Sequence, residues 1–273
     1  MNAPVKELLK AENLRFDYGA DKFTLKDVSL DVCEKDFISV IGRNGSGKST
    51  LVKLLSGIHK HPSGRIYFKR KDISEYERKD LSRSLCYLPQ SGVMLTDKIN
   101  VSDFLLLGRY SYKNFSEFRY SDKDIAIVEE SLKTAGIYEF KDREMSELSG
   151  GERQKVLITL ALVQLNLSED LSSKLLIVDE PLTYLDVNYQ HEIFSILHKL
   201  NAERGLTVIV VMHDLNLALK YTNKTILLNE GWMVFSGKTS DIITVENLRE
   251  HFLIESAVIK NNNETIINFL PKT

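Results

Sequence analysis

Short apolar or β-branched runs alternate along the chain with segments in which apolar residues recur every three or four positions. Such runs predict buried strands, and four occur, at Phe37–Ile41, Leu85–Leu88, Leu175–Val178 and Thr207–Met212. The segment after the first run places four apolar residues on one face of a helix: Leu51, Leu54, Leu55 and Ile58. This alternation predicts an α/β fold with a mostly parallel sheet.

The pattern changes near both ends and in the middle of the chain. Leu14–Tyr18 and Phe23–Val32 predict an antiparallel sheet portion before the first parallel strand. Residues Val101–Met145 lack any comparable β-branched run and are expected to be helical. Near the end, Ala257–Ile259 and Thr265–Phe269 flank three asparagines and predict a small hairpin.

Composition excludes several classes of protein. The 273 residues include 36 Lys+Arg and 38 Asp+Glu, and the isoelectric point near 6.3 argues against a nucleic-acid partner. The longest apolar run, Leu206–Met212, is far shorter than the roughly 20 residues that cross a bilayer, and the N-terminus has no apolar run suited to a signal peptide. Cys33 and Cys86 stand alone, as expected for a reduced cytosolic setting.

A glycine-rich segment follows the first predicted strand directly. Residues Gly42–Thr50 match the pattern G-x-x-x-x-G-K-[ST], between a strand and a helix as that pattern requires. Glycines let successive backbone N–H groups turn inward toward phosphate oxygens, and the positive end of the next helix adds to this. Lys48 is expected to reach the β- and γ-phosphates, and the Ser49 hydroxyl to bind Mg²⁺. The expected phosphate-binding residues are Gly42, Asn44, Gly45, Ser46, Gly47, Lys48, Ser49 and Thr50.

Polar side chains stand at the ends of the other predicted strands. Asp179 and Glu180 follow an apolar strand, where Asp179 would hold the Mg²⁺ shell and Glu180 would polarise an attacking water. Gln90 and His213 follow two further strands. Because ligands of parallel sheets lie beyond the carboxyl ends of the strands, we expect these side chains at one rim with the phosphate loop.

The segment Leu148–Gln154 opens a helical run with two adjacent glycines. Ser149 and Glu152 have the spacing of a capping box, but that leaves Gly150 and Gly151 unexplained in a first turn, where glycine costs stability. Free N–H groups at a positive helix end make a second anion-binding surface. Two such surfaces and one nucleotide per chain are reconciled by a head-to-tail dimer, in which each segment closes on the partner's nucleotide.

Together these motifs resemble those of the ATP-binding cassette (ABC) ATPases, in family order and over nearly the whole chain. The similarity pairs Gly42–Thr50 with Walker A, Gln90 with the Q-loop, Leu148–Gln154 with the signature motif, Asp179 and Glu180 with Walker B and its catalytic glutamate, Leu185-Asp186 with the D-loop and His213 with the switch histidine. It implies an α/β P-loop NTPase with a RecA-like, mostly parallel sheet core, an N-terminal antiparallel β portion and a helical subdomain insert. It also implies ATP and Mg²⁺ as cofactors, with catalytic residues Glu180, His213, Gln90 and Lys48 and metal-binding residues Ser49, Gln90 and Asp179.

The same resemblance suggests how the base of the nucleotide is held. Tyr18 is similar to the aromatic residue that stacks on adenine in this family, an interaction of about 1 kcal/mol. Phe16 is the competing candidate, and Tyr18 could instead be an ordinary core aromatic of the sheet.

The resemblance further implies a division of labour between chains. Residues 1–273 would form a single nucleotide-binding domain, with 91–155 as the helical subdomain and 241–273 as a C-terminal extension. Two copies would sandwich two ATP molecules, with Ser149, Gly150 and Gly151 of each copy on the partner's nucleotide. Integral-membrane permease subunits would dock on the helical insert, including Tyr110–Tyr120 unless that segment is only a solvated face. A substrate-binding protein would take part indirectly, and this chain would lie at the cytoplasmic face of the inner membrane as a peripheral protein.

Three local strings resemble ATPases of iron–siderophore, haem and cobalamin importers: Leu107–Tyr112, Thr183–Val187 and His213–Ala218. The lengthened link Leu165–Lys174 is also common in haem and cobalamin members. A soluble assembly factor of the iron–sulfur cluster type, or an ATPase of another ABC importer or exporter, remains the alternative. DNA-acting and ribosomal members fit poorly, since the chain has no long heptad stretch and only one Walker A and one signature.

Two positions depart from the family pattern. Leu182 stands where Thr commonly follows the Walker B Pro, and Leu160 stands where the signature helix usually carries Arg. These departures bear on local packing and D-loop contacts, and neither residue is expected to touch the chemistry.

Overall fold

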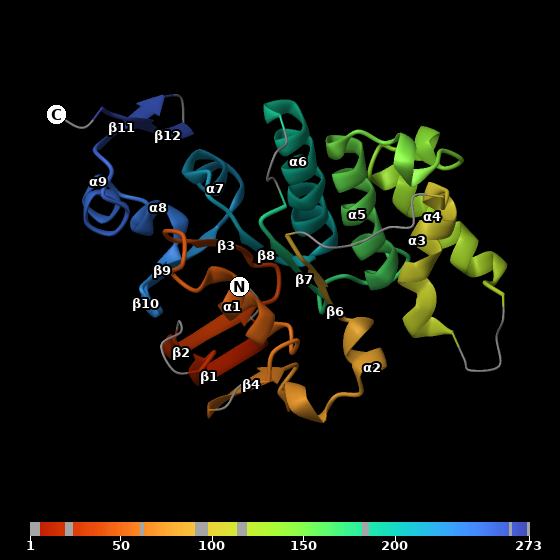
Figure 1. Ribbon diagram of the computed structural model, residues 1–273, viewed down its shortest axis with the longest axis horizontal. Helices are drawn as coiled ribbons and strands as arrows, with labels where there is room; N and C mark the ends of the chain where they lie inside the picture. Colours follow the sequence, from red (N-terminus) through yellow and green to blue (C-terminus); the bar gives the residue numbers. More distant parts are fainter. Residues whose placement is uncertain are drawn as a thin grey trace, which may run out of the picture. The chain divides into compact units, whose positions relative to one another are not determined.

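The computed structural model describes residues 6–19, 24–60, 63–90, 98–113, 119–181, 186–261 and 264–271, which form two compact units. Unit 1 comprises the described residues of Met1–Glu75 and Val208–Thr273, and unit 2 those of Tyr76–Thr207. In Figure 1 unit 1 is coloured red to orange and blue, and unit 2 runs from the light orange of α2 through yellow and green to teal.

The antiparallel portion of unit 1 has four strands in the order β2-β1-β4-β5. Their bounds are β1 (Glu7–Asp17), β2 (Thr24–Cys33), β4 (Ser63–Phe68) and β5 (Lys71–Asp72). Strand β1 is central, since Ala11 faces Leu30 of β2 and Ile66 of β4. The predicted antiparallel portion is therefore confirmed, with β1 starting earlier than the pattern indicated and with β4 and β5 unpredicted.

The parallel strands of unit 1 are centred on β3 (Phe37–Ile41), all five of whose residues are buried. It lies between β8 (Thr207–Val211) and β9 (Lys224–Asn229) and is parallel to both. Strand β10 (Trp232–Lys238) adds antiparallel to β9. A parallel strand covered on both faces has an apolar run in place of alternation, which is why the sequence predicted β3 and β8 correctly.

Helix α1 (Lys48–Leu55) follows the glycine-rich loop. Leu51, Leu54 and Leu55 are fully buried, as predicted. The prediction for Ile58 is wrong, because the helix ends at Leu55 and the chain turns through Gly57 at φ 72°, which leaves Ile58 52% exposed.

The rest of unit 1 is a run of short elements that ends in a hairpin. These are α7 (Leu215–Tyr221), α8 (Thr239–Ile242), α9 (Val245–Asn247), a π-helical turn (Leu248–Phe252), β11 (Ser256–Asn261) and β12 (Glu264–Phe269). Strands β11 and β12 pair antiparallel, with Val258 facing Ile267, and form a terminal hairpin. The Asn216 amide of α7 donates to the Ile267 carbonyl (3.2 Å) and accepts from the Ile267 N–H (2.7 Å), which fastens the hairpin to the helix.

Unit 2 combines two parallel strands with helices. Strands β6 (Leu85–Leu88) and β7 (Leu175–Asp179) pair parallel, with Tyr87 facing Ile177. The helices are α2 (Arg78–Ser82), α3 (Val101–Leu106), α4 (Asp122–Thr134), α5 (Gly150–Leu165) and α6 (Val187–Arg204), with 3₁₀ turns at Leu107–Tyr112, Tyr138–Phe140 and Met145–Glu147. A further 3₁₀ turn, Ile73–Glu75, closes the first stretch of unit 1. The helical prediction for the middle of the chain is confirmed.

The helical part of unit 2 has its own core and a buried ion pair. Its core includes Phe104, Leu105, Leu132, Ile137, Val156 and Val163. Leu160, which stands where the family usually has Arg, packs against this cluster. Its apolar side chain therefore contributes to the core of the helical part. Arg109 is 3% exposed and pairs with Asp124 at 2.8 Å. Burial alone would raise the pKa of Asp124, but hydrogen bonds from Arg109 and Ser121 lower it below its ordinary value.

Within the described ranges, every helix is too short or too polar to cross a bilayer.

Removal of the Asn216 amide tests how the hairpin is held. Asn216→Ala removes both hydrogen bonds to Ile267, together worth about 2 kcal/mol, so the amide protons of β11 and β12 should exchange roughly tenfold to thirtyfold faster. Hydrogen exchange followed by mass spectrometry measures this. The exposed Asn268→Ala is the matched control, and equal exchange in both variants would contradict the role of Asn216.

Candidate active site

The glycine-rich loop after β3 depends on backbone conformations that favour glycine. Gly42, Gly45 and Gly47 have φ values of 150°, 78° and 105°, all in the left-handed region. A Cβ on Gly42 would lie 2.2 Å from the Leu228 carbonyl oxygen of β9. The loop therefore begins where its backbone passes against a neighbouring strand, and no larger residue fits there.

Ser46 gives the loop an unsatisfied hydroxyl. Its Oγ is buried and has no hydrogen-bond partner among the described residues, while its carbonyl accepts from the Gly231 N–H at 3.1 Å. A buried hydroxyl costs free energy without a partner. An orphaned hydroxyl within a cradle of left-handed glycines fits a phosphate group as its partner.

Lys48 lies inside the loop. It is 4% exposed, and its Nζ donates to the carbonyls of Gly42 (2.9 Å) and Arg43 (3.2 Å). Helix α1 begins after Gly47 with no side-chain cap, so its positive end adds to the charge of the ammonium. Ser49 is half-buried in the first turn, and Asn44 is exposed on the loop.

An aromatic cluster lies beside this helix. The Tyr18 hydroxyl is 3.3 Å from both Thr50 Oγ1 and His59 Nε2, and the ring is 42% exposed. Phe16 is half-buried, with its ring stacked on His59 (centroids 5.1 Å apart) and in edge contact with Tyr18. Tyr18 thus offers the more accessible ring next to the phosphate loop.

His213 also belongs to unit 1. Strand β8 pairs with β3 in parallel, with Val211 opposite Val40, so His213 and Gly42 both lie just beyond the carboxyl ends of adjacent strands. His213 is exposed, and the next residue, Asp214, caps α7 by accepting from the N–H groups of Asn216 and Leu217.

The two carboxylates lie at the end of β7 in unit 2. Asp179 is 2% exposed and accepts from the Tyr87 hydroxyl at 3.0 Å. Glu180 has φ 50° and accepts from Gln90 Nε2 at 2.6 Å. Pairing of β6 with β7 thus brings Gln90 to the carboxylate predicted to act on water, and a positive φ on a non-glycine residue is a strained conformation typical of functional sites.

Sequence reasoning missed Tyr87. In an apolar run it has the pattern of a core residue, yet its register opposite Ile177 places it on the same sheet face as Asp179, two residues later. The available signal was a hydroxyl three residues before Gln90, but only the pairing of β6 with β7 shows that it meets Asp179.

The signature segment forms the predicted capping box. Ser149 Oγ accepts from the Glu152 N–H (3.3 Å), and Glu152 Oε2 accepts from the Ser149 N–H (2.8 Å). The latter bond is the main cause that lowers the pKa of Glu152. The two glycines differ: a Cβ on Gly150 would meet no atom within 4 Å, whereas a Cβ on Gly151 would collide with the Tyr189 ring.

Leu182, Tyr184 and Leu185 of the D-loop region lie outside the described residues, as does the central part of Tyr110–Tyr120, whereas Asp186 is described.

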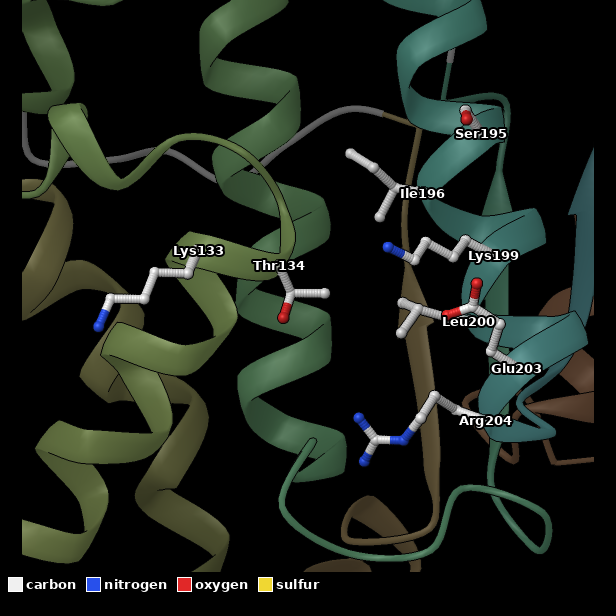
Figure 2. A pocket seen from close by; sticks show the side chains of 8 residues that line it. All are labelled: Lys133, Thr134, Ser195, Ile196, Lys199, Leu200, Glu203 and Arg204. Atoms are coloured by element: carbon white, nitrogen blue, oxygen red, sulfur yellow. The ribbon is translucent and has the colours of Figure 1, made fainter.

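A cavity of about 330 Å³ in unit 2 is not part of this site (Figure 2). Its lining comes from α4 and the second half of α6: Lys133, Thr134, Ser195, Ile196, Lys199, Leu200, Glu203 and Arg204. In Figure 2 the Lys133 side chain points away from α6. The Arg204 guanidinium donates to the Glu169 carbonyl at 3.3 Å. None of the residues that the sequence singled out lines it.

Comparisons with known proteins agree with the motif pattern. A family model described as ABC transporter matches residues 25–183. The chain is 33% identical to the iron(3+)-hydroxamate import ATP-binding protein FhuC of Bacillus subtilis (strain 168), over 92% of this chain and 90% of that protein. In three dimensions it is similar to a metal-chelate type ABC transporter in an inward-facing conformation (TM-score 0.82, 29% identity, 98% of each chain). It is also similar to an ATP-binding cassette in a dimeric post-hydrolysis state bound to ADP and Pi (TM-score 0.71, 26% identity, 85% of this chain and 99% of that one).

The surroundings of His59 predict a pH dependence. Burial, with Lys53 nearby, lowers the pKa of His59 below its ordinary 6.5. As the pH falls below 6.5, the unfolded chain takes up the proton more readily than the folded one. The stability that neutral His59 contributes is therefore complete above pH 6.5 and is lost as the pH falls toward the folded pKa.

An NMR titration of the histidine ring protons measures this, with His59 assigned by comparison with His59→Gln. We expect the His59 resonance to titrate below 6.5 and the variant to lose part of its acid sensitivity. A midpoint at or above 6.5 would contradict the account.

Proposed function

The chain belongs to the ABC transporter family, and from this we propose that it is the ATP-binding and ATP-hydrolysing subunit of an importer for an iron complex or cobalamin. The observation that carries ATP binding is the phosphate loop, in which left-handed glycines, the buried Lys48 and the orphaned Ser46 hydroxyl meet. The class of cargo rests on similarity to FhuC over nearly the full length of both chains.

We propose that most site residues of unit 1 bind the phosphates or the base of ATP. The loop N–H groups from Gly42 to Thr50 bind phosphate oxygens, and Lys48 exchanges its carbonyl partners for the β- and γ-phosphates. Tyr18 stacks on adenine, and His213 contacts the γ-phosphate. Asn44, exposed on the loop, completes the cradle.

The two carboxylates of unit 2 have different proposed roles, Asp179 in binding Mg²⁺ and Glu180 in activating water. Asp179, Ser49 of unit 1 and Gln90 are the proposed ligands of Mg²⁺, which when bound neutralises charge on the phosphates. Oxygen donors of this kind suit Mg²⁺, and the Tyr87 hydroxyl holds one Asp179 oxygen in place. Glu180 takes the proton of the attacking water as general base or orients that water, and Gln90 donates to Glu180 at 2.6 Å, so the pair is oriented before water arrives.

We further propose a head-to-tail dimer, supported by the dimeric cassette to which this chain is similar. Ser149, Gly150 and Gly151 of one copy would bind the γ-phosphate held by the other. The capping box occupies the Glu152 N–H, so the N–H groups of Gly150 and Gly151 at the start of α5 would be available to that anion.

The wider assembly follows from the family. Residues 1–273 would make up one cassette, with 91–155 as its helical subdomain and 241–273 as its C-terminal extension. Leu107 and Tyr110, 51% and 75% exposed on one 3₁₀ turn, would dock on a membrane permease. The chain would then lie at the cytoplasmic face of the inner membrane, with a substrate-binding protein acting on the far side.

Purification from native membranes tests the transport role. The tagged chain, extracted in mild detergent, should bring with it a polytopic permease identified by mass spectrometry. Leu107→Ser with Tyr110→Ser should reduce that recovery without loss of ATP binding. Recovery of soluble assembly proteins in place of a permease would overturn the importer assignment.

Replacement of Glu180 should separate ATP binding from hydrolysis. Glu180→Gln removes the proton acceptor but keeps a side chain of the same size, so hydrolysis should fall about 100-fold or more while ATP holds the dimer closed. Turnover and light scattering with ATP measure the two effects. Wild-type turnover in this variant would contradict the assignment of Glu180.

Replacement of Tyr18 should weaken binding without changing chemistry. Tyr18→Ala should raise the Kd for ATP about fivefold, equivalent to ~1 kcal/mol of lost stacking, with kcat unchanged. Tyr18→Phe should retain wild-type affinity because the ring remains. If Phe16→Leu has the larger effect on Kd, Phe16 is the stacking residue.

A further inference from the structure

Packing singles out one glycine of the signature segment. A Cβ on Gly151 would lie 2.7 Å from Tyr189 Cδ2, 2.8 Å from Cγ and 2.9 Å from Cε2, so the ring lies against the Gly151 backbone. These distances are shorter than real Cβ contacts. Gly150, the adjacent residue, has open space at the same point. Packing alone therefore requires glycine at position 151, apart from any role of its N–H group in binding an anion.

Tyr189 is held at its backbone and at its ring. The backbone N–H of Tyr189 donates to the carboxylate of Asp186, the N-cap residue of α6, at 3.0 Å, which fixes the first turn of that helix. On α5 the Lys155 ammonium lies 4.8 Å from the ring centroid, one turn after Gly151, and pairs with Glu192 of α6. The Lys155 side chain is 13% exposed, so this contact is partly shielded from water.

These contacts join two segments that the family pattern treats separately. Asp186 is the described end of the D-loop region, and Gly151 lies in the first turn of the signature helix. Within unit 2 they are connected by Tyr189, whose ring lies against the Gly151 backbone and whose own backbone N–H is bound by the Asp186 cap. A helix start held in this way keeps its N–H groups in a fixed direction.

We propose that Tyr189 is a positioning residue that sets the place of the signature glycines and makes the first turns of α5 and α6 move as one body. The inference rests on the proposed function, since the signature N–H groups must meet an anion on the partner copy. A displacement of about 1 Å at such a donor can cost on the order of 100-fold in rate, which is how a residue that touches no substrate affects turnover.

A double-mutant cycle tests the contact. Gly151→Ala keeps the N–H group and adds only the Cβ that collides with the ring, so turnover should fall about tenfold or more and the unfolding midpoint should drop. Gly150→Ala is the matched control, and its unfolding midpoint should not drop because the added methyl meets open space. Tyr189→Ala should lower kcat about tenfold with the Kd of the monomer for ATP unchanged, and Tyr189→Phe should restore wild-type kcat.

The decisive variant combines the two changes. With the ring removed the added Cβ fits, so Gly151→Ala/Tyr189→Ala should turn over no more slowly than Tyr189→Ala and should unfold at a higher temperature than Gly151→Ala. Additive losses in the double variant, or a raised monomer Kd in Tyr189→Ala, would overturn the positioning role. A wild-type chain that hydrolyses no ATP would instead overturn the proposed function on which this inference rests.

Discussion

The phosphate loop of this protein depends on two backbones that approach each other more closely than any side chain allows. At Gly42 the loop passes the Leu228 carbonyl of β9, where a Cβ would be 2.2 Å from the oxygen. The turn between β9 and β10 then donates the Gly231 N–H to the Ser46 carbonyl, and its Gly231 carbonyl accepts from the Lys26 N–H of β2. The loop is therefore shaped by the strands around it, and the burial of Lys48 and the start of α1 follow from that shape.

The signature segment in unit 2 likewise depends on a glycine at a point of close packing. There a glycine lies against a tyrosine ring, and residues outside the motif fix where the N–H groups point. Each of the two carboxylates also accepts a hydrogen bond from a neighbouring side chain, Asp179 from Tyr87 and Glu180 from Gln90. Groups proposed to act on the nucleotide are thus oriented by neighbouring side chains, and two of these neighbours, Tyr87 and Tyr189, lie outside the motifs. Such preorganisation is what catalysis requires.

The sequence predicted the parts of the fold that local pattern determines. The buried parallel strands β3, β6, β7 and β8 were predicted to within one residue, because each is an uninterrupted apolar run. Strands β4, β5, β9 and β10 were missed, since their identity depends on distant pairing partners, and Ile58 was placed on a helix that ends before it. For the site, motif spacing was enough to single out Lys48, Asp179 and Glu180, whereas the contacts of Tyr87 and Tyr189 join residues far apart in sequence and could not be inferred from either alone.

The central claim is that a working site takes its phosphate loop from one copy and its signature from another. Mixing two inactive variants measures this directly: a Lys48→Ala chain keeps an intact signature, and a Gly151→Asp chain keeps an intact phosphate loop. A dimer of either variant alone contains no complete site. A mixed dimer would contain one complete site, made from the phosphate loop of the Gly151→Asp chain and the signature of the Lys48→Ala chain. The account predicts that the mixture regains ATP hydrolysis well above the sum of the two separate chains, and a mixture no more active than that sum would contradict it.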